Sequence, residues 1–167
     1  FIALDKDVLD KSYINFLRQG MRGWFEAMTD KPIVFSKHRA WTDFFPHTFA
    51  IDSNSKYLVI LRDLRDIICS LDSLQWKHPH VFFGDREQSL HQYSLDHRMA
   101  KHCTDKSGGL GRPLNSLPHV VEVAHHNPSS FYFLRQEDFN EKPKETLQQI
   151  YEWLGEENFE HDFDNIP

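Results

Sequence analysis

The stretch that decides the fold is Lys56–Ser73, with the sequence KYLVILRDLRDIICSLDS. It begins with an unbroken apolar run, Tyr57–Leu61, which is too short for a helix and rich in strand-forming residues. Such a run is typical of a strand buried on both faces, as in a parallel sheet covered by helices. Apolar residues then recur every three or four positions from Ile67 to Leu74, which predicts a half-buried helix. We therefore expect a strand, a short polar turn and a helix.

The turn after the predicted strand is a candidate anion-binding site. Free backbone N–H groups gather where a strand feeds a helix, at the carboxyl end of the strand. Arg62 lies at this turn, and Ser70 follows eight residues later, two turns into the helix. An arginine fork and a hydroxyl donor in one pocket suit a phosphate dianion. Taken alone, however, the pair favours a simpler interpretation, a solvated arginine and a serine on the helix surface.

Length and composition indicate one domain over residues 1–167, since a chain of this size has little room for two cores. The net charge of −6 argues against a broad nucleic-acid surface. The apolar runs of the chain are no longer than a β-strand, so we expect no membrane-spanning helix. The two cysteines, Cys69 and Cys103, make no disulfide framework, and the N-terminus lacks the layout of a signal peptide. These features predict a cytoplasmic protein.

Strand and helix patterns alternate along the rest of the chain. Short apolar strands are predicted over 33–35 and 131–134, besides the strand over 57–61. Helices are predicted over 8–28, 67–76, 86–102, 118–126 and 142–154, and the segment 41–49 is either helical or irregular. Loops are predicted over 77–84 and 104–118. This alternation indicates an α/β fold with a mostly parallel sheet flanked by helices.

Two segments resemble elements of the nucleotide-dependent sulfotransferase family. Residues Arg62–Ser70, RDLRDIICS, match the family's R-x-x-x-D-x-x-x-S element after a strand. Residues Leu134–Phe139, LRQEDF, with the proline at 143 and the Leu-Gly pair at 154–155, look like the family's L-x-Y-E-D-L…P…F-L-G ending. A third segment, Ile33–His38, ends a predicted strand and is similar in position to the family's K-T-H or D-K segment. The resemblance spans most of the chain.

This resemblance implies a P-loop-NTPase-like sulfotransferase fold and four site residues. In that family the arginine and serine of the first motif hold the 3′-phosphate of 3′-phosphoadenosine 5′-phosphosulfate (PAPS), so Arg62 and Ser70 would bind this co-substrate. His38 would be the catalytic base, because imidazole titrates near neutrality. Lys37 would stabilise the leaving oxygen. A surface histidine without a role explains His38 equally well, and some relatives use a carboxylate instead.

Two departures from the family pattern stand out. The family's upstream phosphate-binding loop, a strand followed by something like P-x-S-G-T-T, is absent, and the nearest glycines, Gly20 and Gly23, lie in QGMRGWF. That loop grips the 5′-phosphosulfate, so we expect an N-terminally truncated, partial domain; a partner chain that fills the gap is the less favoured alternative. In addition, Gln136 stands where the family has a tyrosine.

The sequence therefore predicts a sulfotransferase that moves a sulfuryl group from PAPS to a hydroxyl or amine of a small-molecule or glycan acceptor. No metal is expected, because the eleven histidines show no clean i,i+4 pair and no two cysteines lie close in sequence. The alternative is a non-catalytic nucleotide-binding or interaction domain derived from the same fold. A kinase-like phosphotransferase is disfavoured, because no Walker-type Lys-Ser/Thr pair occurs. No nucleic-acid partner is expected, and no oligomeric state is indicated.

Overall fold

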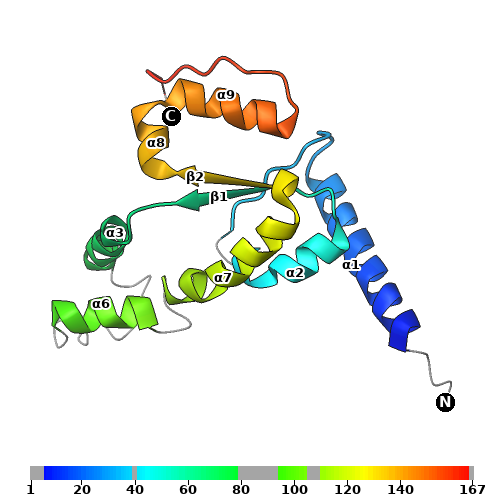
Figure 1. Ribbon diagram of the computed structural model, residues 1–167, viewed down its shortest axis with the longest axis horizontal. Helices are drawn as coiled ribbons and strands as arrows, with labels where there is room; N and C mark the ends of the chain where they lie inside the picture. Colours follow the sequence, from blue (N-terminus) through cyan, green and yellow to red (C-terminus); the bar gives the residue numbers. More distant parts are fainter. Residues whose placement is uncertain (1–5, 39–40, 79–93, 105–109, 166–167) are drawn as a thin grey trace. The chain divides into compact units, whose positions relative to one another are not determined.

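The computed structural model describes residues 6–38, 41–78, 94–104 and 110–165 (Figure 1). The chain divides into two compact units, residues 1–55 and 56–167. That residues 1–167 form one domain stays a prediction. Among the described residues, no helix combines the length and the apolar character that a membrane span requires.

The first unit contains two helices, α1 (Lys6–Met28) and α2 (Trp41–Ile51). The predicted helix over 8–28 is confirmed, and the segment 41–49 is helical. Arg18 joins the two helices, because its Nε donates a hydrogen bond of 2.6 Å to the carbonyl oxygen of Ile51. Ile51 is buried at this contact. The polar turn after α2 closes through hydrogen bonds to Asp52.

The strand predicted over 33–35 is wrong. These residues adopt no regular structure, and Ile33, Val34 and Phe35 are 54%, 42% and 76% exposed. A strand persists only where its backbone N–H and C=O groups pair with a neighbouring strand. Within the described part of residues 1–55 the regular elements are helices, so this apolar segment has no strand to pair with there.

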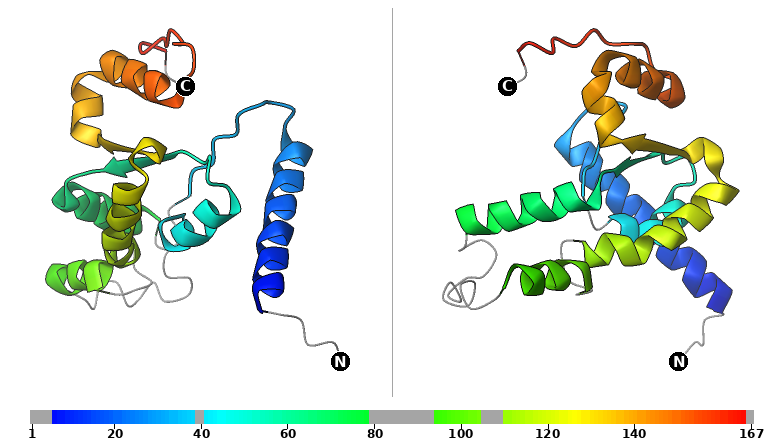
Figure 2. Two further views of the ribbon diagram at one scale, coloured as in Figure 1. Left: turned by 45° about the vertical axis from the view of Figure 1, so that its right-hand side comes forward. Right: turned by 60° about the vertical axis from the view of Figure 1, so that its left-hand side comes forward.

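The second unit is built on a small parallel sheet of two strands, β1 (Tyr57–Leu61) and β2 (Phe131–Arg135). The register pairs Tyr57 with Phe131 and Leu61 with Arg135. Helices α3 (Leu64–Lys77), α6 (Leu95–Thr104) and α7 (Gly111–His126) and the 3-10 turn η2 (Pro128–Ser130) lie between the strands in sequence. Helices α8 (Gln136–Glu141) and α9 (Pro143–Leu154) follow β2 (Figures 1 and 2). The α/β fold class, with a parallel sheet, is confirmed.

The core of this unit lies around β2. Phe131 and Leu134 of β2 are buried, and Val120 of α7 and Ile150 of α9 are buried as well. The expectation that β1 is buried on both faces is wrong, because its residues are half-buried and Ile60 is 56% exposed. Among the described strands β1 pairs with β2 alone, so it lies at an edge of the sheet rather than inside one.

The helix predictions of this unit hold with one correction. Helices α3 and α9 are confirmed, and α9 is capped by Gly155, whose φ of 81° is the left-handed conformation that favours glycine. The loop predicted over 104–118 is wrong from Gly111 onward, because α7 begins there and contains Pro118. The predicted loop over 79–84 and the predicted helix over 86–93 lie outside the described residues; the remainder of that helix is matched by α6.

Candidate functional site

The candidate site lies at the carboxyl end of the parallel sheet. Because Leu61 pairs with Arg135, the chain leaves both strands at the same end of the sheet. Arg62 follows β1 directly, and the first turn of α8 follows β2. Ligands of α/β proteins bind at this end of a sheet, where strands feed helices. The polar turn that the sequence predicts is therefore in the expected place.

The structure places Arg62 and Ser70 on one continuous strand–turn–helix segment. Arg62 is exposed, and its side chain makes no hydrogen bond or ion pair with any residue that the structure describes. Ser70 is the seventh residue of α3 and is also exposed, with its hydroxyl uncommitted within the described part of the chain. As far as the described residues are concerned, both side chains are thus available to a ligand. Their roles stay predictions.

Asp63 starts helix α3 and fixes the turn beside Arg62. Its carboxylate accepts the backbone N–H of Arg65 at 2.8 Å and the Arg65 guanidinium at 2.6 Å. These two hydrogen bonds, the side-chain one first, lower the pKa of Asp63 from 3.8 to about 2. The sequence analysis missed this helix cap, although an aspartate directly before an amphipathic helix is its usual signal. Arg65, 88% exposed at its side chain, is held by this ion pair.

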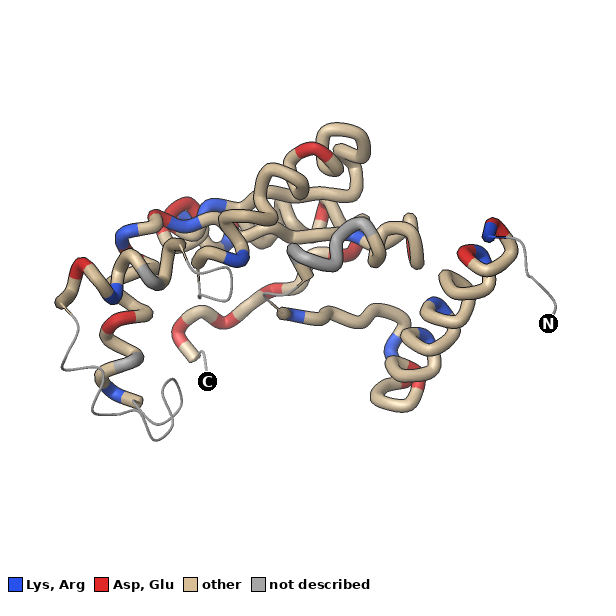
Figure 3. Tube along the Cα trace, turned by 90° about the horizontal axis from the view of Figure 1, so that it is seen from below, with Lys and Arg blue, Asp and Glu red and all other residues tan. Residues whose placement is uncertain are grey.

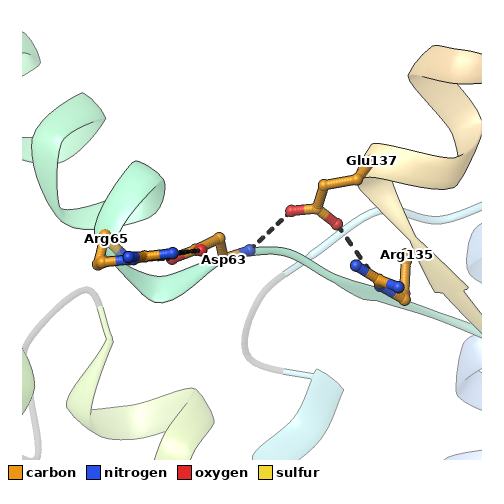
Figure 4. A network of polar contacts seen from close by, with 4 residues as sticks. All are labelled: Asp63, Arg65, Arg135 and Glu137. Atoms are coloured by element: carbon orange, nitrogen blue, oxygen red, sulfur yellow. Dashed lines mark hydrogen bonds and ion pairs between the residues drawn. The ribbon is translucent and has the colours of Figure 1, made fainter.

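Glu137 connects the turn to α8 (Figure 4). Its Oε1 accepts a hydrogen bond of 2.9 Å from the backbone N–H of Asp63, and its Oε2 lies 3.9 Å from Nε of Arg135. The Asp63 N–H is the main cause that lowers the pKa of Glu137. Glu137 belongs to the segment that resembles the family ending, but no sequence pattern links it to a residue 74 positions earlier.

The opposite side of α3 is held by α6. Arg98 donates from Nε to Asp72 at 2.8 Å, and the Arg98 guanidinium lies 5.1 Å from the centre of the Trp76 ring. Both charged side chains are largely covered, and the hydrogen bond from Arg98 is the main cause that lowers the pKa of Asp72. This contact anchors the helix that carries Ser70.

Lys37 and His38 lie in the first unit, in the non-helical segment that leads into α2. Both side chains are exposed, and the carbonyl of His38 accepts the backbone N–H of Trp41 at 3.3 Å. The indole of Trp41 donates to Ser36 at 3.3 Å, so this segment is fixed beside the start of α2. The two residues belong to a different unit from Arg62 and Ser70, and their catalytic roles stay predictions.

The charge distribution along the described chain shows no cluster suited to a metal ion. Three or more His, Cys, Asp or Glu side chains in ligating position do not occur within the described ranges. The tail after α9, at residues 156–164, contains acidic residues and neither lysine nor arginine, and its trace in Figure 3 is red and tan without blue.

Comparison with protein families identifies the family of this chain. A family model described as Sulfotransferase domain matches residues 11–166. The matched range covers most of both units and includes all four predicted site residues. No curated protein and no solved structure matches the chain.

Proposed function

Since this chain belongs to the sulfotransferase family, we propose that it moves a sulfuryl group from PAPS to a hydroxyl or amine acceptor. The observation that carries the proposal is Arg62, a guanidinium without a protein partner in the described chain, at the carboxyl end of β1. A cation held there by fixed backbone, but not neutralised by a carboxylate, is what an anionic ligand requires.

The residues at this end of the sheet fit a nucleotide 3′-phosphate. Arg62 supplies a planar fork of donors, and Ser70 supplies a hydroxyl donor on the following helix. The first turn of α3 adds the positive end of its dipole. PAPS, when bound, supplies the sulfuryl group, and adenosine 3′,5′-bisphosphate is the leaving group. Arg62 and Ser70 hold the part of this nucleotide that does not react.

Residues of the first unit activate the acceptor and stabilise the leaving oxygen. His38 takes the proton from the acceptor hydroxyl or amine as the new bond to sulfur forms, and Lys37 offsets charge on the leaving oxygen. The acceptor is a small molecule or a glycan, and the chemistry needs no metal. We place the reaction in the cytoplasm, in line with two cysteines that form no disulfide, and treat residues 1–167 as one sulfotransferase-like domain.

Thermal unfolding with adenosine 3′,5′-bisphosphate tests the donor site. Ligand at about one hundred times its Kd stabilises a protein by about 2.7 kcal/mol, so the Tm should rise measurably. Arg62→Ala should weaken binding by about 1.5–2 kcal/mol, roughly 10–30-fold, the lower part of the range for a charged hydrogen bond because Arg62 is exposed. Arg65→Ala is the matched control, because this arginine lies in the same turn but is engaged by Asp63.

Two results would contradict the proposal. A folded chain whose Tm does not respond to millimolar bisphosphate lacks the donor site. A chain that binds the nucleotide but transfers no labelled sulfuryl group from PAPS to any hydroxyl or amine acceptor offered supports the alternative, a non-catalytic nucleotide-binding or interaction domain of the same fold.

A further inference from the structure

We infer that Glu137 is a positioning residue for Arg62: by accepting the backbone N–H of Asp63, it fixes the turn that presents the Arg62 guanidinium to the nucleotide 3′-phosphate. The inference rests on the proposed function, because it assigns a role within the same donor site. It adds a residue from the far end of the sequence, on α8, to a site otherwise built from β1 and α3.

The backbone on both sides of Arg62 is fixed by contacts with other elements, while its side chain makes no hydrogen bond or ion pair with a described residue. Leu61, the residue before it, is paired with Arg135 in the sheet. Asp63, the residue after it, donates its N–H to Oε1 of Glu137 at 2.9 Å and caps α3 with its own carboxylate. A donor that holds an anion gains affinity when its own position is fixed before binding, since less freedom is lost in the complex.

The charge of Glu137 is directed at the backbone and not at the guanidinium that binds the ligand. Its Oε1 contacts the Asp63 N–H, and its Oε2 faces Arg135 at 3.9 Å. Arg135 therefore offsets the negative charge of Glu137 close to the proposed phosphate position. The pKa of Glu137 is lowered by the Asp63 N–H, so the carboxylate stays ionised below the usual range and its hydrogen bond stays charge-assisted. Arg62 remains unpaired with any described residue.

Isothermal titration of three Glu137 variants tests this role with two ligands, adenosine 3′,5′-bisphosphate and adenosine 5′-monophosphate. Glu137→Ala and the shorter Glu137→Asp, which withdraws the carboxylate from the Asp63 N–H, should each weaken bisphosphate binding about three- to tenfold. Glu137→Gln should retain most of the affinity, because its amide oxygen can still accept the hydrogen bond. Affinity for the monophosphate should not change. Glu141→Ala, on the same short helix and exposed, is the control.

The outcomes separate this inference from the function on which it rests. If Arg62→Ala weakens bisphosphate binding and both Glu137→Asp and Glu137→Ala leave it unchanged, the inference is overturned and the donor site stands. Equal weakening for both ligands would also overturn it, because that result describes a general loss of structure. If Arg62→Ala itself has no effect, the donor site fails and the inference fails with it. Glu137→Asp keeps the test decisive even if Glu137→Ala does not fold.

Discussion

Replacing Arg98 by alanine is expected to destabilise the protein by about 2–3 kcal/mol. Arg98 on α6 donates two hydrogen bonds to Asp72 on α3, of 2.8 and 3.3 Å, and its guanidinium faces the ring of Trp76. The Arg98 and Asp72 side chains are only 13% and 15% exposed. The substitution therefore removes both hydrogen bonds and the ring contact, and it deprives a mostly covered carboxylate of its arginine.

The size of this loss follows from how much water reaches the pair. An exposed ion pair contributes about 0.2–1 kcal/mol. Removing one partner of a fully buried pair costs about 3–5 kcal/mol, because the remaining charge is left uncompensated. Because Arg98 and Asp72 are slightly exposed, we expect the cost of losing this pair to lie just below the range for a fully buried pair. The lost contact with Trp76 accounts for about 0.5–1 kcal/mol of the total. In a chain of 167 residues the Tm should fall by roughly 6–9 °C.

Urea unfolding followed by tryptophan fluorescence measures this loss. Arg98→Lys is the control, since it keeps the positive charge but loses the planar fork and should destabilise less. The folded-state pKa of Asp72 lies below its ordinary value, so its stabilisation is present above that value and disappears as the pH falls through the lowered pKa. The difference between wild type and Arg98→Ala should therefore shrink in acid. A loss below about 0.5 kcal/mol at neutral pH would refute this reasoning.

The remaining predictions concern His38 and Asp63. His38→Ala should lower kcat for sulfuryl transfer from labelled PAPS with little change in KM for the nucleotide, and turnover at the wild-type rate would move the base to another residue. The pKa of Asp63 is about 2 when folded and 3.8 ordinarily, so its contribution to stability is present above the ordinary value and is lost as the pH falls toward 2. Asp63→Asn, an uncharged cap, should lose less stability across that range in urea unfolding; an identical pH dependence of the two proteins would contradict the assignment.

Local sequence patterns were sufficient for the central strand–turn–helix. The apolar run Tyr57–Leu61 is β1, and the three- and four-residue period after it is α3. Each element is defined by which side chains of a short segment are buried, and the spacing of apolar residues in the sequence indicates this directly. Burial on both faces did not follow, because an apolar run of five residues reads the same at the edge of a sheet as in its middle.

Sequence patterns gave wrong predictions where the conformation depends on a neighbouring strand or on the place of a residue within a helix. Ile33–Phe35 has the composition of a strand, but a strand also needs a neighbour. Gly111 and Pro113 read as loop residues, yet both lie in the first turn of α7, where the missing N–H of proline removes no intrahelical bond. Pro118 lies farther along the same helix, on an exposed position.

The sequence proposes residues for the candidate site, and their roles stay predictions, but it does not show the contacts that support the turn between β1 and α3. Arg62 and Ser70 are assigned from the resemblance of residues 62–70 to the family's motif, because their spacing after a strand is by itself explained as well by solvated side chains. The hydrogen bond between Glu137 and Asp63 joins residues 74 positions apart and depends on the register of β1 with β2. No local pattern contains that register, so Glu137 could enter the site only through the folded chain.

The most direct test of the account compares two nucleotides on two proteins. We expect wild-type protein to bind adenosine 3′,5′-bisphosphate at least about tenfold more tightly than adenosine 5′-monophosphate, because only the former carries the 3′-phosphate that Arg62 and Ser70 hold. In Arg62→Ala this preference should largely disappear. Equal affinity of wild type for both ligands, or a preference that survives in Arg62→Ala, would contradict the assignment of Arg62 to the nucleotide 3′-phosphate.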